Sequence, residues 1–129
     1  MPLLRFDLVE GRTDAQLQAL LDAAHRAMLA AFRVPAGDRY QLVHEHAASR
    51  MIVEDTGLDI TRTNKVVFLQ VTTRPRPQAQ KQEFYRLLVA ELEKSCGISP
   101  SDVVVSMVTN ADEDWSFGHG RAQFLTGEL

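Results

Sequence analysis

The chain repeats its own pattern of apolar and polar residues after 64 positions, and no other feature of its 129 residues constrains the fold as strongly. A shift of 64 places Leu4–Leu8 on Phe68–Thr72, and it places apolar positions 20, 24 and 28 on positions 84, 88 and 92. Few residues are identical, so the repeat lies in the order of the patterns. Such a repeat predicts two copies of one supersecondary unit that share a core.

Each half is expected to form a strand, a helix and a returning strand. The strands are predicted from alternating or β-branched apolar runs at residues 2–9, 40–46, 65–73 and 102–109. Thr13 can cap a helix that begins at Asp14, while Pro77 and Gly97 suit the start and the end of a second helix. Because strand–helix–strand crossovers are normally parallel and right-handed, each half is predicted to be a βαβ unit.

Two βαβ units bury both helices only if their strands join into one sheet. We therefore expect an α+β fold in which the units are related by a pseudo-twofold axis, with one mixed sheet and two helices on one face. A single domain is expected to span residues 1–129, with repeat halves at about 1–46 and 65–109 and a C-terminal aromatic tail at 110–129. Met51–Val53 could form a short strand in the segment that joins the halves.

Composition and charge exclude several classes of function. Hydrophobic residues are 45% and charged residues 24% of the chain, as in ordinary globular proteins. The net charge of −3 gives no basic field for nucleic acid or for an anionic membrane surface. No apolar run approaches the ~20 residues of a membrane span, and the N-terminus does not resemble a signal peptide. A soluble cytoplasmic protein is expected, and its single cysteine, Cys96, excludes an intrachain disulfide.

The pseudo-twofold arrangement brings two chemically interesting segments together. If the first strands of the two units pair antiparallel, Pro2 lies beside Thr73, Arg74 and Arg76. Removal of Met1 would leave Pro2 with a free secondary amine, which can act as a base, an acid or an iminium-forming nucleophile. Two arginines held by prolines, at the start of a helix, suit a carboxylate. The sequence therefore predicts a site in which two arginines bind a carboxylate beside the amine of Pro2.

Each of these residues also has a plainer interpretation. Many chains begin Met-Pro without catalytic meaning, and Arg74 and Arg76 could belong to a solvated basic loop. Asp38 could orient water or tune the amine, but Asp102 occupies the same place in the other half, which suggests a hydrogen bond to the backbone. His44 and His46 share one face of a strand, yet no third metal ligand stands out.

Taken together, Pro2, the βαβ repeat and the arginine pair resemble the tautomerase superfamily, and most closely its malonate semialdehyde decarboxylases. The resemblance extends over the whole chain. The stretches that carry it are Met1–Leu4, Glu10–Asp14, Asp38–Tyr40, Glu54–Gly57, Arg74–Arg76, Cys96–Pro100, Asp114–Gly118 and Phe124–Gly127.

The resemblance implies a tautomerase fold and decarboxylation of malonate semialdehyde, a 3-oxo acid, to acetaldehyde and carbon dioxide. It implies Pro2 and Asp38 as catalytic residues and Arg74 and Arg76 as the residues that bind the substrate carboxylate. The apolar wall of the pocket would be formed by Trp115, Phe117, Phe124 and Leu129. The resemblance also implies a homotrimer that uses neither a metal nor an organic cofactor.

Other functions fit the same residues. A hydratase or dehalogenase of 3-halo-acrylates, which are unsaturated carboxylates, would use the arginines for binding, Pro2 to protonate carbon and Asp38 to activate water. A tautomerase of a phenylpyruvate-type enol is a further possibility. A non-enzymatic binding protein on the same scaffold would be favoured if Met1 is retained, because an acylated proline nitrogen is not a base.

Overall fold

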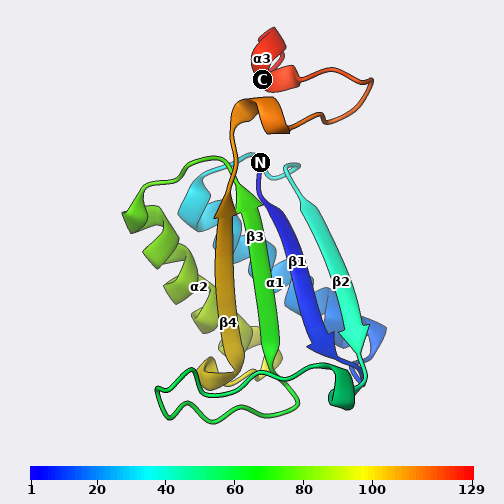
Figure 1. Cartoon of the computed structure of the whole chain (residues 1–129), viewed down its shortest axis with the longest axis vertical. Helices are drawn as coiled ribbons and strands as arrows, with labels where there is room; N and C mark the ends of the chain where they lie inside the picture. Colours follow the sequence, from blue (N-terminus) through cyan, green and yellow to red (C-terminus); the bar gives the residue numbers. More distant parts are fainter.

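The computed structural model describes residues 1–129 and contains two βαβ units joined in one four-stranded sheet (Figure 1). The strands are β1 (Leu3–Val9), β2 (Tyr40–His46), β3 (Val67–Thr73) and β4 (Val103–Thr109). The helices are α1 (Asp14–Phe32), α2 (Gln78–Cys96) and the short α3 (Gln123–Thr126). Single 3₁₀ turns lie at η1 (Ala48–Arg50), η2 (Pro100–Asp102) and η3 (Asp112–Asp114).

The sheet has the predicted pseudo-twofold topology. Its strand order is β2-β1-β3-β4, with parallel pairing inside each βαβ unit and antiparallel pairing of β1 with β3 at the centre. Leu3 pairs with Thr72 and Leu8 with Val67, so the start of each central strand lies beside the end of the other. The two units therefore meet at two equivalent places, one at each end of the central strand pair.

Local sequence signals account for the ends of the two long helices. At the start of α1, the Thr13 hydroxyl accepts a hydrogen bond from the Gln16 N–H at 3.2 Å, and the Thr13 N–H donates to the Gln16 side chain at 2.9 Å. This reciprocal pair is a capping box. At the end of α2, Gly97 adopts a left-handed conformation with φ of +63°, which glycine tolerates without steric cost.

Both long helices pack on one face of the sheet and leave the other face uncovered (Figure 1). Alternate residues of β1, namely Leu4, Phe6 and Leu8, are buried among helix residues such as Phe84 and Leu88. No helix of the chain is both long enough and apolar enough to cross a membrane.

The predicted short strand at Met51–Val53 is wrong, because these residues lie in a loop. The joining segment passes across the lower end of the uncovered face (Figure 1). Ile52 and Val53 there line a hollow together with Phe68 and Val104 of the sheet. The apolar residues of this segment therefore contact the face of the sheet and not a strand edge.

Candidate active site

The candidate active site lies where the beginning of β1 meets the end of β3 (Figure 1). Pro2 immediately precedes β1 and is buried, and the Leu3–Thr72 pair places it next to Thr73. Arg74 and Arg76 follow β3 directly, in the turn that leads into α2. The juxtaposition of Pro2 with the two arginines thus follows from the antiparallel pairing of the central strands.

The amino group at the start of the chain lies among four charged side chains. Burial lowers the pKa of the Met1 amino group below its ordinary value of 8.0. The nearby Asp38 carboxylate opposes this effect and raises the pKa, Arg76 and Arg74 lower it, and Asp112 raises it again. An amine at this position is therefore less basic than one in water, and it has a carboxylate close enough to influence its charge.

Asp38 is a buried carboxylate that the protein leaves partly unpaired. It ends the loop after α1, where its N–H donates to the Pro35 carbonyl at 2.9 Å. Its side chain is buried, and Oδ1 has no hydrogen-bond partner. Burial raises the pKa of Asp38, while the positive charges of the terminal amine, Arg76 and His25 act in the opposite direction. Such a carboxylate can accept a hydrogen bond from a substrate or from water.

Asp102, the counterpart of Asp38 in the repeat, is fully paired. Its carboxylate accepts hydrogen bonds from the Thr63 N–H at 2.7 Å and from the Thr63 hydroxyl at 2.5 Å. Both donors belong to the segment that joins the two halves. The hydrogen bonding expected from the repeat therefore exists at Asp102, whereas no equivalent bond holds the Asp38 side chain.

Arg76 is held in place by the protein while part of its guanidinium stays free. Its Nε donates to the Thr73 hydroxyl at 3.1 Å, and its guanidinium carbon lies 4.9 Å from the centre of the Phe32 ring. Burial and the neighbouring Arg74 lower the pKa of Arg76, and Asp38 opposes them. Nη2 makes no hydrogen bond within the chain, so it can donate to an anion.

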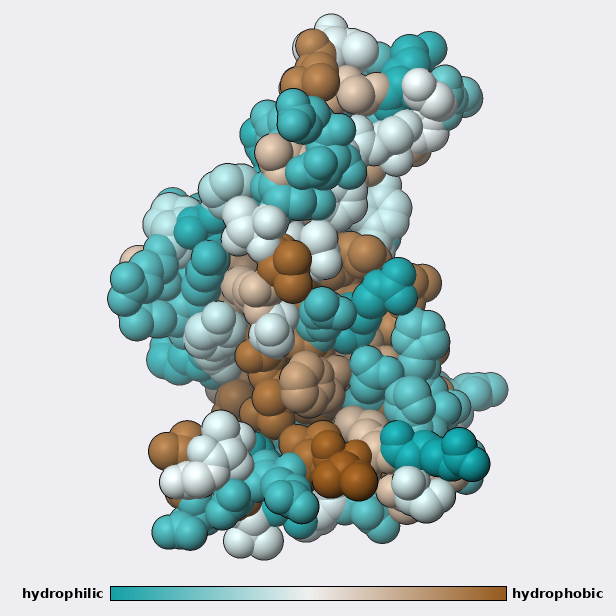
Figure 2. Space-filling view, in the orientation of Figure 1, coloured by the Kyte–Doolittle hydropathy of each residue, from teal (hydrophilic) through white to brown (hydrophobic).

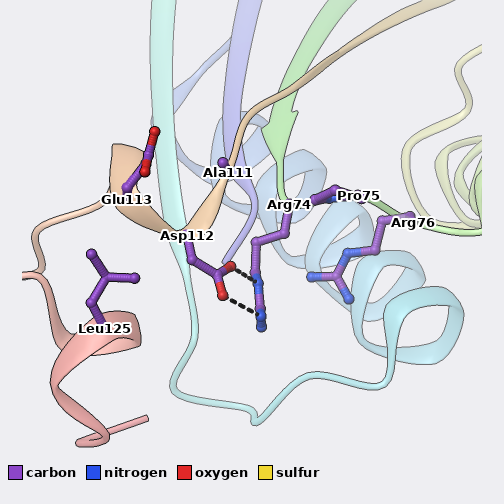
Figure 3. Close-up of a pocket in the computed structure, with 7 residues that line it drawn as sticks. All are labelled: Arg74, Pro75, Arg76, Ala111, Asp112, Glu113 and Leu125. Carbon is purple, nitrogen blue, oxygen red and sulfur yellow. Dashed lines mark hydrogen bonds and ion pairs between the residues drawn. The ribbon is translucent and has the colours of Figure 1, made fainter.

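Arg74 is paired with Asp112, which lies in η3 after the end of β4. Figure 3 shows the two-point contact, in which Arg74 Nε and Nη2 donate to the two Asp112 oxygens at 2.6 and 3.1 Å. The Arg74 guanidinium carbon also lies 4.2 Å from the centre of the Phe124 ring. These contacts fix the guanidinium and leave Nη1 without a partner. Because β4 runs parallel to β3, the residues that follow the two strands lie at the same end of the sheet. An acidic residue soon after β4 was therefore the sequence signal for this pair.

A cavity of about 550 Å³ opens beside the two arginines (Figure 3). It is lined by Arg74, Pro75, Arg76, Ala111, Asp112, Glu113 and Leu125. Pro2 and Asp38 are not among the lining residues of this cavity. Of the residues that line the cavity, Arg76 has the largest electrostatic effect on the pKa of both the terminal amino group and Asp38.

Three of the four predicted wall residues gather in one aromatic cluster. Phe117 lies 5.5 Å from Trp115 and 5.3 Å from Phe124 between ring centres, and its ring also stacks on Tyr40 at 6.1 Å. The cluster joins the C-terminal segment to the start of β2 and to Arg74. None of the four predicted wall residues lines the cavity itself, whose one large apolar lining residue is Leu125. Leu129 is 64% exposed.

His25, on α1, is a further polar residue near the site. It is buried, and its Nε2 lies 3.0 Å from the Ala36 carbonyl in the loop that presents Asp38. His46, in contrast, pairs with Asp7 at 2.6 Å on the sheet. No group of three or more His, Cys, Asp or Glu side chains is arranged to hold a metal ion.

Comparison with known proteins places this arrangement in a family. Two family models described as tautomerase enzymes match residues 38–118 and residues 2–59. A probable tautomerase of Bacillus subtilis strain 168, YrdN, is 57% identical over 129 residues, which are the full length of both chains. A second probable tautomerase of that strain, YusQ, is 31% identical and covers 97% of this chain and 99% of its own.

Solved structures agree with the sequence comparison. A malonate semialdehyde decarboxylase, studied for its decarboxylase and hydratase activities, is 60% identical with a TM-score of 0.97, and the match covers 98% of both chains. Another malonate semialdehyde decarboxylase, inhibited by 3-bromopropiolate, is 39% identical with a TM-score of 0.94 over 98% of this chain and 97% of the other. A fused 4-OT crystallised as a symmetric trimer shares the fold at 23% identity and a TM-score of 0.79, over 97% and 98% of the two chains. With two family models and full-length relatives in agreement with the observed fold, this chain belongs to the tautomerase superfamily of enzymes.

Proposed function

We propose that this enzyme decarboxylates malonate semialdehyde to acetaldehyde and carbon dioxide without a cofactor. The observation that carries the proposal is that Pro2 lies beside the end of β3, from which Arg74 and Arg76 follow. Asp38 supports it, because this buried carboxylate acts on the charge of the terminal amino group. The 60% identity to a malonate semialdehyde decarboxylase supports this choice of substrate. The reaction requires removal of Met1, which exposes the secondary amine of Pro2.

The reaction needs a sink for the electrons of the bond that breaks. When the carbon–carbon bond to the carboxylate breaks, its electron pair moves toward the aldehyde carbonyl two bonds away. Protonated Pro2 stabilises the developing enolate by a charged hydrogen bond, and protonation of carbon then gives acetaldehyde. Burial and the arginines lower the pKa of an amino group at this end of the chain, and the Asp38 carboxylate opposes them, so Asp38 is the group that favours the charged amine that this route needs. In the alternative route, neutral Pro2 forms an iminium ion with the aldehyde.

Arg74 and Arg76 orient the substrate in this proposal. A carboxylate bound tightly only in its ground state would resist leaving as neutral carbon dioxide, because catalysis requires stronger binding of the transition state. Fixed guanidiniums instead hold the substrate so that the carbon–carbon bond that breaks overlaps the π system of the carbonyl. The contacts of Arg74 with Asp112 and Phe124, and of Arg76 with Thr73, supply the necessary rigidity.

The test is a time course of acetaldehyde formation from malonate semialdehyde, with protein whose mass proves the loss of Met1. Pro2→Ala should nearly abolish turnover and Arg76→Ala should impair it strongly. Arg86→Ala is the matched control, because Arg86 pairs with Glu83 on the exposed side of α2, away from the site. Normal rates in both site variants would refute the assignment. Borohydride trapping of an adduct on Pro2 would favour the iminium route.

A second candidate is hydration or dehalogenation of 3-halo-acrylates. The buried Asp38 oxygen without a protein partner favours it, because that oxygen could orient and deprotonate water. Inhibition of a relative by 3-bromopropiolate, a halogenated unsaturated carboxylate, is in keeping with this chemistry. Incubation with 3-chloroacrylate decides the matter: release of chloride at a rate comparable to decarboxylation would support the second function. Retained Met1 with no turnover of either substrate would instead favour a binding role.

We further propose that the chain forms a homotrimer and that the uncovered face of the sheet is the interface between its subunits. Apolar residues gather on this face in Figure 2, and exposed Leu42 on β2 and Val108 on β4 contribute to the apolar surface. A face of this kind is usually covered by a partner. Light scattering after gel filtration should give three times the 14.5 kDa chain mass. Leu42→Lys together with Val108→Lys should reduce the measured mass, and an unchanged mass would exclude this face as the interface.

A further inference from the structure

A second cavity of about 300 Å³ lies at the opposite end of the central strand pair from the candidate active site. Its lining includes two cationic side chains and no carboxylate. The lining residues are Arg12, Gln16, Ala19, Leu20, Lys65, Ser95, Cys96, Gly97 and Ile98. Leu20 and Ile98 are almost fully buried in the hydrophobic core, so the apolar floor that a ligand can touch is formed by the partly exposed Ala19 and Cys96. None of these residues takes part in the proposed reaction.

This cavity is the counterpart of the candidate active site in the internal repeat. The shift of 64 residues places Arg12 on Arg76, and it places Phe32 on Cys96. The antiparallel pairing of β1 with β3 makes the two ends of the pair equivalent, since Leu8 pairs with Val67 as Leu3 pairs with Thr72. Arg12 therefore stands just beyond β1 as Arg76 stands beyond β3.

The counterpart lacks the groups that would make it catalytic. Val66 stands where Pro2 stands in the first half, so no free amine is present. The Asp102 carboxylate, equivalent to Asp38, is occupied by two hydrogen bonds from Thr63. Of the two arginines, Arg74 is replaced by Glu10, which does not line the cavity, whereas Arg76 keeps a basic counterpart in Arg12. Arg12 leaves a site that can bind an anion without transforming it.

Arg12 has donor capacity that the protein does not use. Its Nη2 donates to the Lys65 carbonyl at 2.6 Å, whereas its Nη1 is buried and has no hydrogen-bond partner. No carboxylate forms an ion pair with Arg12. Burial lowers the pKa of Arg12, with Cys96, Asp102 and Glu45 acting in the opposite direction. Because no carboxylate neutralises Arg12, its guanidinium can pair with an anion that enters the cavity.

We propose that this second cavity binds a short-chain carboxylate and does not turn it over. Arg12 and Lys65 bind the carboxylate group, and Ala19 and Cys96 contact the short carbon chain. The apolar floor and the two cations favour a monocarboxylate of a few carbons over a bare inorganic anion. The site thus has the same ligand chemistry as the candidate active site, because both derive from the same end of a βαβ unit.

The test follows the amide signals of Gly97 and Ile98 by NMR in uniformly ¹⁵N-labelled protein titrated with 3-hydroxypropanoate. Arg76→Gln is used as the background, because it weakens the active site and leaves the second cavity intact. Saturable shifts of both amides are expected in this background. 3-Hydroxypropanamide, which has the same size as 3-hydroxypropanoate but no charge, and sodium chloride at matched ionic strength should leave them unmoved.

Two variants assign the shifts to the cationic side chains. Arg12→Gln should weaken binding about tenfold or more, as expected for loss of a charge-assisted hydrogen bond. Lys65→Gln, at an exposed position, should weaken binding without risk to the fold, and it decides the outcome if Arg12→Gln does not fold. The rate of Cys96 modification by a thiol reagent should fall at saturating ligand. Shifts that are absent, or equal in both variants and the background, would overturn the proposal whether or not the enzyme is a decarboxylase.

Discussion

Asparagine at position 38 should make the fold more stable while it makes the enzyme slower. Asp38 is only 5% exposed, and its Oδ1 has no hydrogen-bond partner. Leaving a buried polar group unsatisfied costs about 1–3 kcal/mol, and more when the group is charged. Because the amide of Asn also needs partners, we expect a net gain in the free energy of unfolding of about 1 kcal/mol at pH 8. For a chain of this length, that gain corresponds to a rise in Tm of about 3–5 °C.

The pH dependence of this effect has a definite sign. Folding raises the pKa of Asp38 above its ordinary value of 3.8, so the folded state holds the proton more tightly than the unfolded state does. The stability from this group is therefore fully present below pH 3.8 and is lost as the pH rises through the raised pKa. Asp38→Asn does not suffer that loss. The Tm difference between variant and wild type should be smallest in acid and should grow toward neutral pH.

Thermal unfolding from pH 3.5 to pH 8 measures this difference in Tm. Acetaldehyde production at neutral pH measures the loss of activity, which should be about 10²–10⁴-fold because a catalytic acid–base group is removed. Asp102→Asn is the matched control. Asp102 has the same place in the repeat but accepts two hydrogen bonds from Thr63, so its replacement should lower the Tm. A Tm for Asp38→Asn that is unchanged or lower at pH 8 would refute the reasoning about an unpaired buried charge.

Three further predictions concern other parts of the molecule. Asp112→Ala should raise KM for the carboxylate substrate severalfold, because it releases Arg74; steady-state kinetics test this. The same change should alter the free energy of unfolding by less than about 1 kcal/mol, because this ion pair is well exposed to solvent, and a melting curve tests that part. Thr13→Ala should destabilise the fold by about 1 kcal/mol through loss of the capping box and leave kcat unchanged; a large loss of activity would contradict this. Phe117→Ala should remove the ring that links Trp115, Phe124 and Tyr40, and limited proteolysis should then cut residues 110–129 faster than in wild type.

The sequence predicted the architecture well because each signal was local and was repeated. The alternating apolar residues of β1 and β3, the capping residue Thr13 and the helix-ending Gly97 each act within a few residues of themselves. The repeat then required the two units to meet, and their pairing with Leu3 opposite Thr72 placed Pro2 beside the arginines. The main elements of the site followed from topology alone.

The details of the site depended on contacts that no local pattern specifies. Arg74 and Asp112 are separated by 38 residues, and their pairing results from how the C-terminal segment turns after β4. The aromatic cluster likewise joins Phe117 to Tyr40, which belongs to a different unit. The segment at 51–53 could not be placed, because apolar residues outside a strand or helix carry no periodicity that indicates a direction.

The position of the site at the junction of β1 and β3 has a consequence for how the chain folds. Each βαβ unit contains its own parallel strand pair, but the pairing of Leu3 with Thr72 connects residues far apart in sequence. Contacts of high sequence separation form late, because the entropy of closing a long loop opposes them. The amine and the arginines therefore come together only when the two halves dock, so recovery of activity during refolding should lag behind recovery of helical signal.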